Sequence, residues 1–184
     1  MITRKMQELL DAANADRAGL LAAAGNLSEA QLNYKPGADL WSIADILQHL
    51  AIVEEANGKL LARMLGKLTE AAGPADDTPD GSVLGETIAL LTTLQNLPPI
   101  KAPERVAPIE HKPAVESLAR LAASRENVTR LAAELSAYDL SAVSFPHPVA
   151  GPLNLYAWLL FTGVHERRHT GQISRIKAGA GFPR

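Results

Sequence analysis

Apolar residues recur every three or four positions in four long stretches of the chain, at residues 5–24, 42–65, 113–137 and 154–178. Polar residues separate them, as they do on a helix that buries one face. In the first stretch this face carries Met6, Leu9, Leu10, Ala13, Leu20 and Leu21. The pattern predicts four amphipathic helices, each several turns long.

Local signals mark where these helices begin and end. Ser42, with Asp45 three residues later, forms a capping box before the second helix. Pro113 suits the first residue of the third helix, and Asn154 can cap the fourth. Glycines predict the ends of the first, second and fourth helices, at Gly25, Gly66 and Gly179.

The segments between these helices are less regular. Residues 69–111 contain repeated Gly and Pro breakers, with one short helix predicted at residues 83–94. Residues 27–32 predict a single turn capped by Ser28, and residues 138–152 predict a loop. No stretch shows a strand pattern of convincing length. The sequence therefore predicts an all-α protein, a single domain over residues 1–184, folded as a four-helix bundle. The long connection between the second and third main helices lets those two run parallel instead of forming a hairpin.

Composition excludes several classes of function. With Lys+Arg 18 against Asp+Glu 20, no basic field favours nucleic acid, and we expect no nucleic-acid partner. The chain has no cysteine, which excludes disulfides, thiolate metal sites and an internal cysteine nucleophile. The longest near-apolar run, residues 153–164, is too short to span a bilayer, and the N-terminus lacks the apolar core of a signal peptide. We expect a cytoplasmic protein with no membrane partner.

Two histidines four residues apart, His165 and His169, lie on one face of the predicted fourth helix. They share an inward seam with other residues at the same helical spacing, namely Trp158, Thr162, Gln172 and Ile176. Two adjacent buried imidazoles are costly unless their lone pairs are occupied, and a cation would occupy them. The pair therefore predicts part of a metal site.

The same segment, His165-Glu166-Arg167-Arg168-His169, matches the H-E-x-x-H pattern of zinc proteases. Those enzymes take a third ligand from downstream. Residues 170–184 contain no Asp, Glu, His or Cys, so that completion is impossible here and a peptidase is disfavoured.

The third ligand is expected on the second helix, where His49 lies in the middle of the inward seam. Taken alone, His49 would be read as a core histidine bonded to a backbone or side-chain partner. Three inward histidines without an obvious buried carboxylate instead favour a metal. Three protein ligands leave coordination positions open, which is typical of catalytic rather than structural sites.

Several segments, in this order and separation, resemble the DinB-like family: Tyr34–Pro36, Trp41–Leu50, Phe145–Gly151 and His165–Ile173. The resemblance implies a four-helix bundle that binds a divalent metal through His49, His165 and His169, and it implies a homodimer. It also implies chemistry similar to that of S-transferases and isomerases that use a low-molecular-weight thiol, or of metal-dependent hydrolases. Zinc and nickel are expected first and iron next, although three imidazoles do not by themselves select among these metals or copper.

Four further residues are candidates for contact with substrate or for support of the metal ligands. Gln172 shares the metal face and could orient water or substrate there, or bond another helix. Glu166 lies to the side of that face and is read mainly as a surface charge. Arg125 could meet an anionic substrate group, but an arginine reaching to solvent at a helix border is favoured. His147, shortly before the fourth helix, could approach the rim of the site.

Other side chains are given structural roles. Trp41 and Trp158 are read as core residues, and His111 as a solvated one. The sequence thus favours a metal-dependent enzyme that acts on a small-molecule substrate, by thiol S-transfer or hydrolysis. The alternative is a metal-binding or stress-related bundle without catalytic turnover.

Overall fold

A computed structural model of the chain describes residues 2–71, 73–75, 83–95, 101–108 and 112–184. Its long helices are α1 (Arg4–Ala24), α3 (Ile43–Ala71), α5 (Ala114–Leu135) and α6 (Leu155–Ala178). The shorter elements are α2 (Glu29–Leu32), α4 (Val83–Gln95), the 3-10 helix η1 (Glu104–Val106), and the strands β1 (Ser144–His147) and β2 (Gly151–Asn154).

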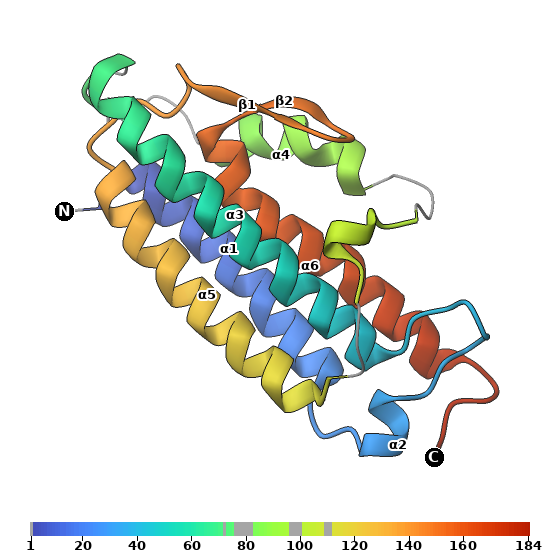
Figure 1. The fold of residues 1–184 in the computed structure, drawn as a ribbon. Helices are drawn as coiled ribbons and strands as arrows, with labels where there is room; N and C mark the ends of the chain where they lie inside the picture. The colour runs from blue at the N-terminus through green and yellow to red at the C-terminus, as the bar shows by residue number, and fades with distance from the viewer. Residues whose placement is uncertain (1, 72, 76–82, 96–100, 109–111) are drawn as a thin grey trace.

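The four long helices form the predicted bundle, and α4 and the strands lie across one side of it (Figure 1). Helices α3 and α5 run side by side in the same direction, as the long connection between them predicted. Their C-terminal ends are joined by backbone hydrogen bonds: Ala75 N–H donates to the Ala137 carbonyl, and Asp139 N–H donates to the Gly73 carbonyl, each at 3.1 Å.

Most of the predicted helix boundaries are confirmed. Ser42 and Asp45 form their reciprocal capping bonds at 2.9 and 3.1 Å, and the Asn154 side chain accepts from Ala157 N–H at 2.9 Å. Ser28 caps the short α2 through a capping box. Pro113 is the N-cap of α5 rather than its first residue, and Gly179 is the C-cap of α6.

The predicted end at Gly66 is wrong, because α3 continues to Ala71. A glycine inside a helix costs about 1 kcal/mol relative to alanine. Leu68, two residues further on, is fully buried in the core. Burial of one leucine side chain stabilises by about 1.5–3 kcal/mol, enough to offset the glycine and carry the helix past it.

Residues 138–152 are not simply the predicted loop, because they include most of an antiparallel hairpin. Strands β1 and β2 pair from Ser144 with Asn154 to His147 with Gly151. Each strand has only four residues and contains a proline, so the alternation of apolar and polar residues typical of a strand is too short to recognise in the sequence. Gly151 adopts φ +74°, a conformation that a glycine reaches without strain.

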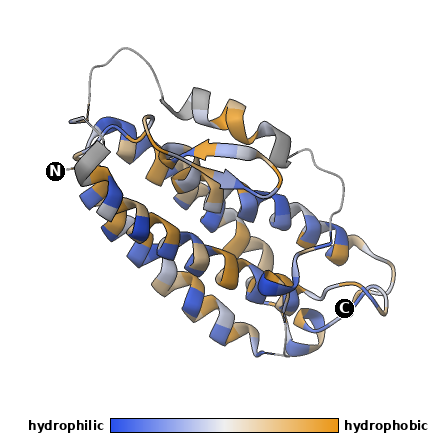
Figure 2. Cartoon of the chain, turned by 45° about the horizontal axis from the view of Figure 1, so that its top comes forward, coloured by the Kyte–Doolittle hydropathy of each residue, from blue (hydrophilic) through white to orange (hydrophobic). Residues whose placement is uncertain are grey.

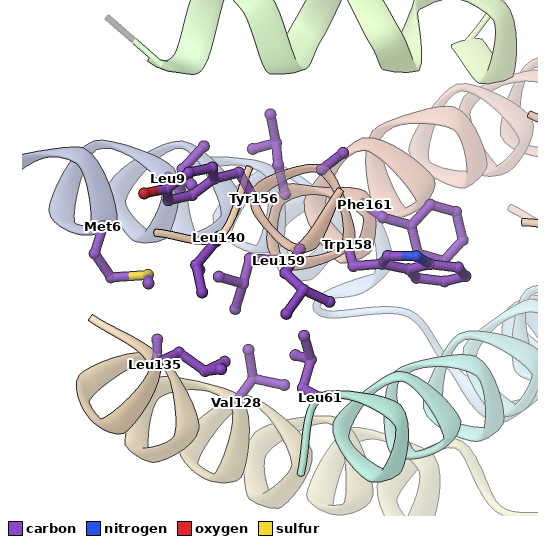
Figure 3. Close-up of a cluster of buried hydrophobic side chains, with 14 of the residues drawn as sticks. Met6, Leu9, Leu61, Val128, Leu135, Leu140, Tyr156, Trp158, Leu159 and Phe161 are labelled. Atoms are coloured by element: carbon purple, nitrogen blue, oxygen red, sulfur yellow. The ribbon is translucent and has the colours of Figure 1, made fainter. Parts of the chain in front are cut away.

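Apolar side chains fill the interior of the bundle. Figure 2 shows hydrophobic and hydrophilic residues alternating along the long helices, as expected when one face of each is buried. Figure 3 shows the larger cluster, in which Leu61, Val128 and Leu159 meet from three helices. Helix α6 lies close against α1 at Gly163, where a Cβ atom would come within 2.7 Å of the Ala13 Cα atom. The glycine thus permits the close contact that holds α6 in the bundle.

Candidate metal centre

The three predicted histidines come together inside the bundle. His49 lies in the first half of α3, and His165 and His169 lie one turn apart on α6. The Nε2 atom of His165 is 3.3 Å from Nε2 of His49 and 3.2 Å from Nε2 of His169. One nitrogen from each ring lies within 4.8 Å of the others. The grouping predicted from helical spacing is therefore present.

The far nitrogens of two of these rings are held by hydrogen bonds. His49 Nδ1 lies 2.7 Å from the Val106 carbonyl oxygen, and His169 Nδ1 lies 2.9 Å from Oε1 of Gln172. Both oxygens only accept, so each Nδ1 carries the proton and each Nε2 presents a lone pair. Gln172 thus orients the His169 ring, and Val106 orients the His49 ring, a role that could not be predicted from the sequence.

The environment keeps these histidines neutral. Burial lowers the pKa of His169 from 6.5 to about 3, with a smaller contribution from His49. Burial and the neighbouring histidines together lower the pKa of His165 well below 6.5. Burial also lowers the pKa of His49, although its bond to the Val106 carbonyl acts in the opposite direction. Neutral imidazoles are the form that binds a metal ion.

Two of the three nitrogen separations match those expected around a metal ion. Two nitrogens that each lie about 2.05 Å from one zinc ion, at the tetrahedral angle, are about 3.3 Å apart. The observed separations from His165 are 3.2 and 3.3 Å. The lone pairs of His49 and His169 both lie close to Nε2 of His165, so a proton or a cation must lie between these nitrogens. The donor set is therefore suited to a divalent transition metal.

Aromatic rings border the centre on two sides. The Trp41 ring centroid lies 4.9 Å from that of His49 and 6.5 Å from that of His169. The Phe161 ring stacks on His165 at 5.2 Å. Trp41 packs against the core, as predicted, but it is partly exposed and also lies against His49 and His169. It therefore forms part of the site.

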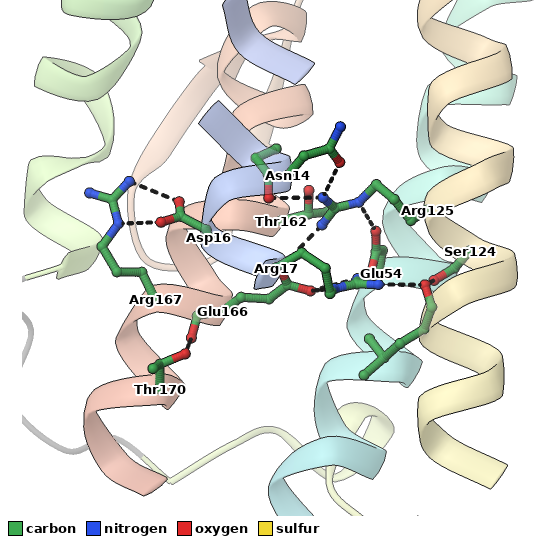
Figure 4. A network of polar contacts seen from close by, with 12 residues as sticks. Asn14, Asp16, Arg17, Glu54, Ser124, Arg125, Thr162, Glu166, Arg167 and Thr170 are labelled. Atoms are coloured by element: carbon green, nitrogen blue, oxygen red, sulfur yellow. Dashed lines mark hydrogen bonds and ion pairs between the residues drawn. The ribbon is translucent and has the colours of Figure 1, made fainter. Parts of the chain in front are cut away.

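The prediction that Glu166 is a surface charge is wrong. Only 2% of the residue is exposed. Its carboxylate accepts from Arg17 Nε at 2.6 Å and from Arg125 Nη2 at 3.2 Å (Figure 4). Burial raises the pKa of Glu166, while the two arginines lower it. Both carboxylate oxygens are thus occupied by arginines, so the residue that serves as general base in the protease pattern has a structural role here.

The prediction that Arg125 reaches to solvent is also wrong, because this arginine is buried and completes the same network. It donates to Glu54 Oε1 at 2.7 Å and to the Ala13 carbonyl at 2.9 Å. Arg17 also pairs with Glu54. Two arginines and two glutamates, one from each long helix, form a neutral cluster inside the bundle. Arg125 is therefore not at hand for a substrate anion.

His147 lies at the end of β1, beside the aromatic residues of α6. Its ring is 4.9 Å from Phe161 and 5.3 Å from Trp158. It is near enough to His165 to contribute to the lowered pKa of that residue. Trp158 is a core residue, as predicted. His111 lies outside the described residues, so its predicted exposure stays a prediction.

Within the described residues, no helix combines the length and the apolar character needed to cross a membrane.

Comparison with known proteins agrees with the fold. The family model of the DinB superfamily matches residues 12–173, a range that includes all three histidines. The chain is 30% identical over 152 residues to the uncharacterized protein YuaE of Bacillus subtilis (strain 168), covering 82% of this chain and 86% of that protein. It is similar in fold to TT2238, a four-helix bundle protein, with a TM-score of 0.57 and 22% identity over 91% of this chain and 96% of that one. The chain belongs to the DinB superfamily.

Proposed function

We propose that the protein binds one divalent metal ion through His49, His165 and His169 and uses it to act on a small molecule. The observation that carries this proposal is the convergence of three imidazole nitrogens. In His49 and His169, a hydrogen bond to Val106 or Gln172 holds the proton on Nδ1, so that Nε2 is free to bind a metal. Such fixed tautomers characterise metal-binding histidines, whose orientation depends on the partner of the second nitrogen.

A metal held by three histidines has open coordination positions and supplies Lewis acidity to whatever small molecule binds there. The surrounding residues limit which chemistry is available. Glu166 and Glu54 are engaged by arginines, so neither carboxylate can accept a proton at the centre. The chain also has no cysteine. Both facts favour a nucleophile brought from outside, either a low-molecular-weight thiol or water.

The proposed reactions are therefore transfer of a small thiol to an electrophile, or hydrolysis of a small substrate. Trp41 and Phe161 border the histidines with apolar surface, which limits water near the metal and favours a substrate with an apolar part. Zinc and nickel are the metals proposed first. A homodimer located in the cytoplasm is part of the same proposal.

Metal analysis of the untagged protein tests the centre directly. The wild-type protein is expected to retain about one equivalent of metal after dialysis, and His49→Ala is expected to retain almost none. His147→Ala is the matched control, because it also removes one histidine but leaves the three converging nitrogens in place. Equal metal content in the wild-type and His49→Ala proteins would refute the three-histidine centre.

Activity then separates catalysis from metal binding alone. The metal-loaded protein is assayed with several low-molecular-weight thiols against an aryl halide electrophile, and with p-nitrophenyl esters. Turnover that His165→Ala abolishes supports the proposed enzyme. Full metal content without turnover in either assay would instead favour a metal-binding bundle that is not catalytic.

A further inference from the structure

The hairpin holds His147 firmly over the N-terminal half of α6. The indole N–H of Trp158 donates to the Phe145 carbonyl at 3.1 Å. Just beyond the same open end of the hairpin, Leu155 N–H donates to the Leu140 carbonyl at 3.2 Å. Trp158 and Phe161 lie side by side at one end of the core cluster (Figure 3), and the His147 ring contacts both. The hydrogen bonds of the hairpin and the ring contacts with Trp158 and Phe161 thus hold His147 in place.

The turn after β1 also determines which nitrogen of His147 carries the proton. The backbone N–H groups of Val149 and Ala150 both donate to Nδ1, at 3.2 and 3.1 Å. A ring nitrogen accepts a hydrogen bond only when it is unprotonated, so the proton of the neutral ring is on Nε2. Protonation of Nδ1 would break both bonds of the turn, and burial acts in the same direction by lowering the pKa of His147.

His147 therefore presents an N–H donor on the side away from the turn. Among the described residues, nothing accepts a hydrogen bond from Nε2, and the residue is only partly buried. The His147 ring lies one aromatic ring away from the metal centre, because Phe161 contacts both His147 at 4.9 Å and His165 at 5.2 Å. A donor held in place beside aromatic surface is suited to an oxygen atom on a bound molecule.

We propose that His147 is a substrate-binding residue, whose Nε2–H donates to an oxygen acceptor of a small molecule held by another of its atoms at the three-histidine centre. This inference rests on the proposed function. The ligand class that it implies has a metal-binding atom, apolar surface against Phe161, and a carbonyl or similar oxygen that reaches the hairpin. His147 acts by hydrogen bonding and transfers no proton in this role.

Matched thiol probes test the proposal without any assumption about turnover. The full-length protein is loaded with cobalt(II), and binding is followed through the thiolate-to-cobalt absorption band. Three amides, 2-mercaptoacetamide, 3-mercaptopropionamide and 4-mercaptobutanamide, place a carbonyl at increasing distance from the sulfur. Ethanethiol, 1-propanethiol and 1-butanethiol are their controls without an oxygen.

The wild-type protein is expected to bind at least one amide about threefold to tenfold more tightly than the matched alkanethiol, as one hydrogen bond allows. His147→Asn keeps an acceptor for the turn, but its amide N–H lies about where the ring Cδ2 lies and does not reach as far as Nε2. It should therefore lose this preference while cobalt content and alkanethiol affinity stay unchanged. His147→Phe keeps the ring packing, lacks both nitrogens, and should show the same loss.

Two outcomes overturn the proposal. If the wild-type protein shows no preference for an amide of any length, or if both variants keep the wild-type preference, His147 does not contact the ligand, although the metal centre still stands. A wild-type protein that binds no cobalt overturns the metal centre and this inference together.

Discussion

The Glu166 carboxylate accepts a hydrogen bond from Arg17 Nε at 2.6 Å, although Glu166 directly follows the metal-centre residue His165 in sequence. Successive residues on a helix point about 100° apart, so the glutamate faces α1 and α5 while the histidine faces α3. The ion cluster of Arg17, Glu54, Arg125 and Glu166 therefore fixes the rotation of α6. With that rotation set, His165 and His169 point at His49.

Loss of one charge from this ion cluster should be costly. Glu166→Gln leaves Arg17 and Arg125 with only one of the two carboxylates that they share inside the bundle. Breaking a buried ion pair costs about 3–5 kcal/mol. Glu134→Gln is the matched control, because Glu134 pairs with Arg130 on the surface, where about 0–1 kcal/mol is expected. Urea unfolding of both variants measures the two free energies of unfolding. Similar losses in the two variants would show that burial of the cluster does not matter to stability.

Gln172 should tune metal affinity without binding the metal. Gln172→Leu removes the acceptor at His169 Nδ1, and loss of such a partner typically lowers metal affinity by about 10–100-fold. Gln172→Glu keeps an acceptor and adds a negative charge, so its affinity should equal or exceed that of the wild type. Zinc competition with a chromophoric chelator measures all three proteins. Wild-type affinity in Gln172→Leu would mean that this hydrogen bond does not orient the ligand.

Metal removal should lower thermal stability. A ligand that binds only the folded state stabilises it by about 2.7 kcal/mol when its free concentration is 100 times its dissociation constant. Chelation with EDTA is therefore expected to lower the Tm of the wild-type protein by several degrees. His49→Ala, which lacks one nitrogen of the centre, should show no shift between EDTA and added zinc. An equal shift in that variant would place the stabilising metal elsewhere.

The metal-free protein should lose stability as the pH falls below 6.5. The folded-state pKa values of His49, His165 and His169 all lie below 6.5, so the unfolded chain binds protons that the folded chain does not. Stability is thus complete above pH 6.5 and declines as the pH falls toward the folded-state values.

His165 and His169, whose pKa values are lowered furthest, each add up to about 1.4 kcal/mol per pH unit to that slope between pH 5 and 6. Burial raises the pKa of Glu166, so the folded chain gains stability at this residue as the pH falls, which offsets part of the loss at the histidines. The difference in slope between the wild-type protein and a histidine variant is therefore the sharper measurement. His169→Asn should reduce the slope by the contribution of one proton, as measured by urea unfolding at several pH values. An unchanged slope would mean that His169 titrates normally in the folded state.

Helical periodicity predicted the long helices and the pairing of His165 with His169, because both depend on spacing within one helix. The pairing of His49 with the other two histidines followed from its central position on a second inward face. The Val106 carbonyl could not be found in this way, since it is a backbone group of an irregular segment 57 residues from His49. Its position depends on the path of the chain, which spacing does not encode.

The roles of Glu166 and Arg125 were mispredicted because each residue was considered on its own helix. Their partners Arg17 and Glu54 also stand among inward-facing positions: Arg17 is four residues after Ala13 and three before Leu20. The two glutamates and two arginines lie on the inner faces of the four long helices, one on each, and their charges cancel. Counting inward charges over all the helices together would have indicated a buried cluster, whereas a single helical wheel could not.

The hydrogen bond from His49 to the Val106 carbonyl ties the long connection between α3 and α5 to the metal centre. By thermodynamic linkage, an interaction that stabilises η1 in this position also stabilises the orientation of the His49 ring. A metal bound to that ring would in turn stabilise the hydrogen bond from His49 to Val106 in η1. A change in the stability of this connection would therefore change the affinity of the centre for a metal. Relatives that differ in its length would be expected to differ in how tightly they hold the ion, even with the same three histidines.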